Sequence, residues 1–247
     1  MASFAKILAE ASADAILISG DISLSARITA DLEEIARHVP DPVYFVLGNH
    51  DYYGGSIENT RTSVAEACQN VDNLHYLSQC DVVPLTTSTC LMGHDGWGDA
   101  RAADFLKSTI LLKDYRLIEE LSGVSAQVLE GRLKALGDEA ARHTAEQLDV
   151  ALQRFDHVVF LTHVPPFRDA AVYEHRQSDD NWAPHFVCQA VGDVLEERMA
   201  ANADKTLQVL CGHTHGDGEG QILPNLEWHT GGAEYRKPRI HHIFDVS

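Results

Sequence analysis

Four short apolar segments, each followed closely by polar residues that can bind metal ions, constrain the fold of this chain more than any other feature. The segments have the composition of strands buried on both faces of a sheet, and they span residues 15–18, 43–47, 157–161 and 207–211. The residues that follow them are Gly20-Asp21, Gly48-Asn49-His50-Asp51, Thr162-His163 and Gly212-His213-Thr214-His215. Because ligands bind beyond the carboxyl ends of the strands in such sheets, we expect the four loops to meet at one site.

Helical patterns separate these segments. Phe4, Ile7, Leu8 and Ala11 recur at helical spacing, and similar patterns predict helices over residues 25–38, 56–70, about 103–155 with a break near Gly123, and 184–203. Shorter strands are expected at residues 81–85, 89–92, 221–223, 226–230 and 240–245, and a loop at 93–104. Alternating strands and helices favour a mixed or parallel sheet with helices outside. Without an internal repeat or a low-complexity linker, residues 1–247 are expected to form one domain.

Charge and cysteine content narrow the function. Lys and Arg number 19 and Asp and Glu number 37, so the net charge is −18. Such a chain repels phosphate polyanions, which argues against nucleic-acid partners and against an anionic membrane surface. The five cysteines are scattered, and the first residues show no secretory signal pattern. These features predict reduced thiols in a cytoplasmic protein.

The residues of the four loops suit a transition-metal site. They offer carboxylate, amide oxygen and imidazole groups, which bind Mn, Fe, Co or Zn, and the absence of thiolate argues against a structural zinc. His213 and His215 stand two residues apart, and on extended backbone this spacing points both side chains to one side. Each loop is a weak signal alone, but all four in this order, each after a strand, form a strong one.

The ordered motifs Gly-Asp, Gly-Asn-His-Asp, a lone His and Gly-His-x-His resemble those of the calcineurin-like metallophosphoesterase superfamily. The resemblance extends from about residue 14 to residue 235. It implies an α/β fold, a four-layer α/β/β/α sandwich of two mixed sheets flanked by helices. It also implies two divalent metal ions (Mn, Fe, Zn or Co) and hydrolysis of a phosphomonoester or phosphodiester by metal-activated hydroxide. The expected partner is a small phosphorylated substrate, and the oligomeric state is left open.

The resemblance assigns a role to each matched residue. In it, Asp21 bridges both metals, His215 binds the first metal, and the second metal is completed by Asn49, His163 and His213. His50 contacts the phosphate and assists the leaving group, and Asp51 is the expected partner that orients His50. Three further residues are candidates for substrate binding, with a packed turn or a surface residue as the alternative: His94, Asp95 and Arg168.

One motif of the family is absent. An Asp-x-His sequence should end a strand upstream of Gly20-Asp21, and without it the first metal keeps only Asp21 and His215 as assigned ligands. One interpretation is that a central strand is missing, and it is favoured because the sheet without that strand would leave part of the core exposed at a cost in free energy. A second is that the chain holds one metal and is a weak or inactive metal-binding scaffold. The third interpretation is that other residues replace the missing ligands, the candidates being His94, Asp95, Asp99, His185, His229 and Glu234. A di-metal hydrolase of amides or esters is disfavoured, because an amide ligand is unusual in such enzymes.

Overall fold

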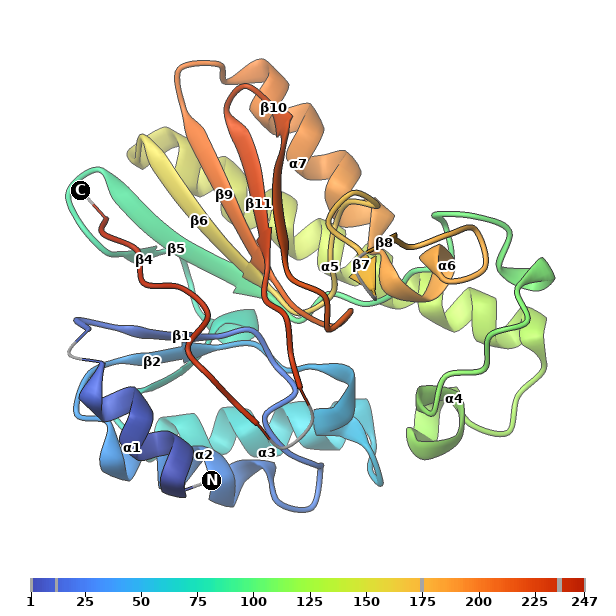
Figure 1. The fold of residues 1–247 in the computed structure, drawn as a ribbon, viewed down its shortest axis with the longest axis horizontal. Helices are drawn as coiled ribbons and strands as arrows, with labels where there is room; N and C mark the ends of the chain where they lie inside the picture. The colour runs from blue at the N-terminus through green and yellow to red at the C-terminus, as the bar shows by residue number, and fades with distance from the viewer. Residues whose placement is uncertain (1, 12, 174–175, 235–236, 247) are drawn as a thin grey trace.

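A three-stranded sheet covered by helices on its outer face forms one half of the molecule (Figure 1). The computed structural model describes residues 2–11, 13–173, 176–234 and 237–246. All strands of this sheet are parallel, in the order β1 (Ile16–Ile18), β2 (Val43–Phe45) and β3 (Leu74–Tyr76). Its helices are α1 (Ala2–Glu10), α2 (Ile28–His38) and α3 (Ile57–Gln69).

A six-stranded sheet with two long helices on its outer face forms the other half (Figure 1). Its strands are, in spatial order, β10 (Gly218–Leu223), β11 (Leu226–Thr230), β9 (Thr206–Cys211), β6 (His157–Thr162), β5 (Thr89–His94) and β4 (Val83–Pro84). The four central strands are parallel and the two edge strands are antiparallel to their neighbours. The covering helices are α5 (Ala126–Arg154) and α7 (Gln189–Ala201).

The two sheets face each other across a shared core. Leu91, Val159, Leu161 and Leu210 of the larger sheet are buried there with Val46, which follows β2. The four layers confirm the predicted α/β/β/α sandwich. The larger sheet is mixed as expected, whereas the described strands of the smaller one are all parallel, because each is followed by a helix or a long connection that returns the chain to the same end.

The structure corrects two predicted elements. The helix expected from about residue 103 begins only at Ala126, and residues 105–121 contain three short helical turns instead: η3 (Phe105–Lys107), α4 (Asp114–Leu117) and η4 (Glu119–Leu121). Contacts with distant loops hold this segment, such as the hydrogen bond from the Ser108 hydroxyl to the Asn181 carbonyl at 2.8 Å. Residues 240–245 form no strand in the described structure. Strand β3 and the paired strands β7 (Val172–Tyr173) and β8 (Arg176–Gln177) were not predicted. The helix predicted over residues 184–203 is divided into the short α6 (Ala183–Phe186) and α7.

A large cavity lies along β1. Among the described residues β1 pairs with β2 alone, and a cavity of about 1630 Å³ is lined by Leu17 of β1, by Leu161 and Leu210 of the larger sheet, and by Asp21. The C-terminal segment crosses in front of this region (Figure 1), where Phe244 packs against the core between the sheets. The missing central strand stays a prediction. Across the part of the chain that is described, no helix is long and apolar enough to span a membrane.

Candidate metal centre

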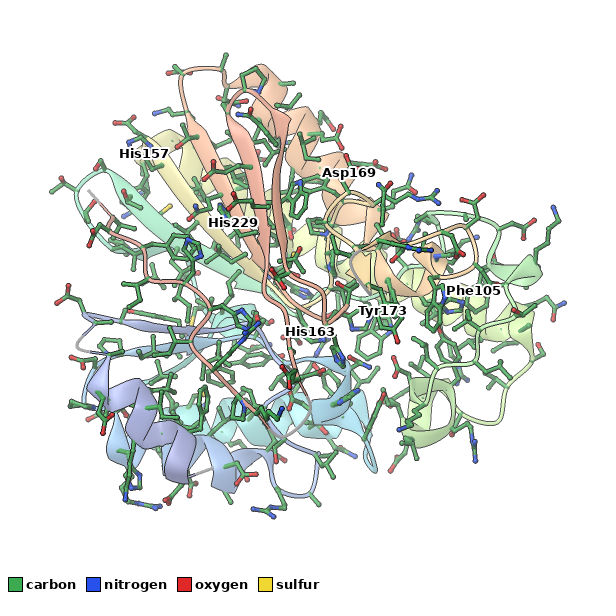
Figure 2. The ribbon with its side chains drawn as sticks, in the orientation of Figure 1. Phe105, His157, His163, Asp169, Tyr173 and His229 are labelled. Carbon is green, nitrogen blue, oxygen red and sulfur yellow. The ribbon has the colours of Figure 1, made fainter. Side chains whose placement is uncertain are left out.

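The carboxyl ends of β1, β2, β6 and β9 bring the four predicted loops together where the two sheets meet. Figure 2 shows His163, directly after β6, at this position. The Asn49 Oδ1 atom lies 3.1 Å from His163 Nε2 and 3.0 Å from His213 Nδ1. His163 Nε2 lies 3.2 Å from His213 Nδ1 and 3.4 Å from Asp21 Oδ1. The structure therefore gathers four of the five predicted metal ligands around one point.

The atoms that face this point are lone-pair donors. His163 Nδ1 donates a hydrogen bond to the Ser19 carbonyl at 2.7 Å, so His163 Nε2 carries no proton when the ring is neutral. His213 Nε2 lies 3.3 Å from the His185 carbonyl, which leaves His213 Nδ1 as the unprotonated nitrogen. Burial lowers the pKa of His213 to about 3, so its ring is neutral at pH 7. Together with the Asn49 oxygen, these nitrogen atoms direct their lone pairs toward one another, and a cation between them would be bound by all three.

The distances fit a transition metal. Ligand atoms bound at about 2.1 Å lie about 3.0 to 3.4 Å from one another in octahedral or tetrahedral geometry, and the separations above fall in that range. Among the described residues, no group of His, Cys, Asp and Glu side chains alone forms a metal site, and this arrangement depends on the amide oxygen of Asn49. The fifth predicted ligand, His215, lines the same cavity as Asp21 and His50.

The backbone around the centre is strained and crowded. Asp21, His213 and His215 have φ angles of 55°, 68° and 63°, a region that non-glycine residues rarely adopt. Two glycines make room for the loops. A Cβ on Gly48 would lie 2.2 Å from Asp21 Oδ1, and one on Gly20 would lie 2.7 Å from His163 Nδ1. Neither position can carry a side chain unless the metal-facing groups move.

His50 lies beside the proposed ligands and is half-buried. Its Nδ1 atom is 3.7 Å from Asp21 Oδ2, and its backbone N–H donates to Asp21 Oδ1 at 3.0 Å. The ring also packs against Tyr53, with 4.6 Å between ring centroids. The structure therefore places His50 beside the predicted ligands, and its role as a proton donor stays a prediction.

The predicted role of Asp51 is corrected. Its carboxylate is fully buried and accepts hydrogen bonds from the backbone N–H groups of Ser23 at 2.6 Å and Gly48 at 2.8 Å. Burial and the nearby charge of Asp21 raise the pKa of Asp51 well above its usual range. Asp51 therefore ties the loop after β1 to the loop after β2, and the carboxylate that faces the His50 ring is that of Asp21.

Of the three residues proposed for substrate binding, Asp95 is corrected because its buried carboxylate is occupied by donors of the protein, whereas for His94 and Arg168 the role stays a prediction. Asp95 is buried, and its carboxylate accepts hydrogen bonds from Tyr52, Tyr76, Ser78 and the Leu47 backbone N–H. His94 is also buried, and burial lowers its pKa to about 3. Arg168 forms an ion pair with Asp180 at 2.6 Å and a hydrogen bond to the Ser178 carbonyl, so it holds the loop after β6.

The other candidates for replacement ligands have partners of their own. Asp99 pairs with Arg101, and Glu234 pairs with Lys237. His229 faces Glu219 and Glu227, and His185 is hydrogen-bonded to Ser108 and Tyr115.

Sequence reasoning missed one residue of the centre. Asp114 of α4 is buried and accepts hydrogen bonds from the Asn49 amide at 2.8 Å and from the Tyr53 hydroxyl at 2.6 Å. The residue lies 65 positions from Asn49 in the sequence. No local pattern could have signalled it, because residues 105–121 were predicted to be part of a helix and the two residues are far apart in the sequence.

The family comparison places the chain among the metal-dependent phosphoesterases. The family model for calcineurin-like phosphoesterases matches residues 1–217, so the chain belongs to that family. The crystal structure of a dimetal phosphatase from Danio rerio is similar in fold, with a TM-score of 0.55 and 13% sequence identity. The alignment covers 94% of this chain and 76% of that one. None of the curated proteins matches the chain in sequence.

Proposed function

We propose that this chain hydrolyses small phosphate monoesters or diesters with two divalent cations held at the centre described above. One observation carries the proposal. Asn49, His163 and His213 turn lone pairs toward a common point, with Asp21 at its edge and His50 beside it. This is the donor set of a cation site with a proton donor next to it.

The residues of the centre have separate roles in the proposed hydrolysis. Asn49, His163 and His213 would hold one cation and His215 the other, with Asp21 as a ligand available to both. When bound, the two cations neutralise the phosphate and lower the pKa of a coordinated water. His50 donates a proton to the leaving oxygen, and the Asp21 carboxylate lies 3.7 Å from its Nδ1. The net charge of −18 disfavours long polyanions, which favours a small substrate. The scattered cysteines favour a cytoplasmic setting.

The first experiment compares two histidines of the metal centre with a histidine at the far end of strand β6. The protein is loaded with Mn²⁺ and assayed with nitrophenyl phosphate and bis-nitrophenyl phosphate, and their relative rates decide between a monoesterase and a diesterase. His213→Ala should lower kcat/KM by more than about 100-fold, since even the outer partners of metal ligands contribute 10- to 100-fold. His50→Ala should lower it by about 10² to 10⁴, the range of general acid catalysis.

The matched control is His157→Ala. His157 is an exposed histidine at the start of β6, at the opposite end from the metal centre (Figure 2), and its loss should leave both rates within about twofold, as for most surface substitutions. Full activity in His213→Ala would refute the proposal. A wild-type chain that binds Mn²⁺ but hydrolyses neither ester would also refute it, and would favour the metal-binding scaffold.

A further inference from the structure

We infer that Asp114 is a positioning residue that keeps the amide oxygen of Asn49, and not its NH2 group, turned toward the metal centre. The inference rests on the proposed function of the centre. Asp114 Oδ1 accepts a hydrogen bond from Asn49 Nδ2 at 2.8 Å, on the side of the amide opposite to His163 and His213. Asp114 Oδ1 accepts hydrogen bonds from both Asn49 Nδ2 and the Tyr53 hydroxyl, so it pairs with the NH2 end of the amide, which is the end that can donate.

The alternative orientation of the Asn49 amide would prevent a cation from binding. The two ends of an asparagine amide are almost equal in size, so the group can turn over without a change in packing. With the amide reversed, its NH2 group would donate to the unprotonated nitrogens of His163 and His213, which lie 3.1 and 3.0 Å away. These hydrogen bonds would occupy the lone pairs that a cation needs. Asp114 opposes this state, because the reversed amide would set an oxygen 2.8 Å from its carboxylate.

The segment that carries Asp114 is fixed to the same loop by its backbone. Gly54 N–H donates to the Leu117 carbonyl at 2.8 Å, and Glu119 N–H donates to the Gly55 carbonyl at 3.0 Å. Tyr53 strengthens the arrangement, since its hydroxyl donates to Asp114 Oδ1 at 2.6 Å and its ring packs against His50. One buried carboxylate from residues 105–121 therefore orients a metal ligand directly and reaches the proton donor through Tyr53.

The test measures Mn²⁺ binding by titration calorimetry and omits hydrolysis. Asp114→Ala should weaken Mn²⁺ binding by about 10- to 100-fold, the range for outer partners of metal ligands. Lys113→Ala, an exposed neighbour on the same turn, is the control and should leave the dissociation constant within about twofold.

A second pair of variants separates orientation from folding. Asn49→Asp replaces the amide by a carboxylate that needs no orientation and is repelled by Asp114. Adding Asp114→Asn to Asn49→Asp should therefore tighten Mn²⁺ binding by about tenfold, whereas Asp114→Asn alone should weaken it, and this reversal of sign supports the inference.

The outcomes are distinct. If the wild-type chain binds Mn²⁺ and the two substitutions weaken binding additively, Asp114 has only a structural role and the inference is wrong, although the proposed function stands. If the wild-type chain binds no Mn²⁺, the proposed function and the inference both fail.

Discussion

Unusual backbone conformations of individual residues are concentrated at the metal centre. Asp21, His213 and His215 are three of the four non-glycine residues with positive φ in the described part of the chain. Such conformations cost about 1 to 3 kcal/mol each and persist where the surroundings impose them. Here the surroundings include the buried carboxylate of Asp51 and the close approach of Gly20 to Gly48. The local backbone strain is therefore concentrated at residues that are predicted to bind a cation.

Asp95 shows how a residue outside the centre supports it, and its effect should depend on pH. Burial raises the pKa of Asp95, but Arg61, His94 and the Tyr76 hydrogen bond outweigh burial, and the net pKa is lowered. An acid with a lowered folded-state pKa stabilises the protein above its unfolded pKa of about 3.9, and the contribution disappears as the pH falls through the folded value. The stabilisation by Asp95 is therefore complete at neutral pH and lost in acid.

Asp95→Asn should lower the free energy of unfolding by about 3 to 5 kcal/mol at pH 7, since it leaves Arg61 without its buried partner at 3.3 Å. Urea unfolding of both proteins between pH 3 and pH 7 measures the effect, and the difference should shrink below about pH 4. The control is Asp72→Asn, an exposed carboxylate. A difference that stays constant with pH, or grows toward low pH, would show that the charge of Asp95 is not what stabilises the fold.

At the scale of elements, the centre depends on loops that follow strands and pack against each other so closely that no further atom fits between them. The loop after β1 contacts the loop after β2 so closely that a Cβ on Gly48 would fall 2.2 Å from Asp21 Oδ1. Gly48 has a φ of −98°, so its backbone alone would accept alanine. The requirement for glycine is one of space.

Gly48→Ala should therefore destabilise the fold by about 1 to 3 kcal/mol, as overpacking does, and should weaken Mn²⁺ binding because Asp21 must move. Gly131→Ala is the matched control, since Gly131 is exposed within α5 and a Cβ added there would meet no atom within 4 Å. That substitution should stabilise the protein by about 0.5 to 1 kcal/mol. Thermal melts with and without Mn²⁺ test both variants, and normal Mn²⁺ binding by Gly48→Ala would contradict the steric argument.

The sequence predicted elements well where one physical signal dominates. Apolar strands such as β6 and β9 and amphipathic helices such as α1 were located from their patterns, and the polar residues after four strands lie close together, as predicted. Residues 105–121 were misjudged because tertiary contacts override a helical pattern there, as at Ser108. A related reason explains why the sequence analysis misassigned or missed Asp51, Asp95 and Asp114. The sequence shows that an aspartate is present, but not whether its carboxylate binds a substrate or accepts a hydrogen bond from the protein.

At the scale of the whole molecule, the centre joins two halves that each have a core of their own in addition to the shared core between the sheets. Asp21 and Asn49 follow strands of the three-stranded sheet, whereas His163 and His213 follow strands of the six-stranded sheet. Figure 1 shows the halves meeting face to face, with the C-terminal segment crossing in front of them. A cation held by these residues crosslinks the halves, so binding must stabilise the contact between the sheets as well as the loops.

Mn²⁺ should therefore stabilise the protein by about 2.7 kcal/mol at a concentration 100 times its dissociation constant, and a chelator should reverse the effect. We expect calorimetry to resolve one tightly bound ion, held by Asn49, His163 and His213, and a weaker one at Asp21 and His215, because fewer protein ligands are assigned to it. Thermal melts of His213→Ala and of the surface control His157→Ala complete the test. The stabilisation by Mn²⁺ should vanish in the first and persist in the second, since only His213 faces the point where the two sheets meet. Equal stabilisation of both variants by Mn²⁺ would mean that the ion binds elsewhere. Two equally tight ions would mean that further residues of this chain bind the metal assigned to Asp21 and His215.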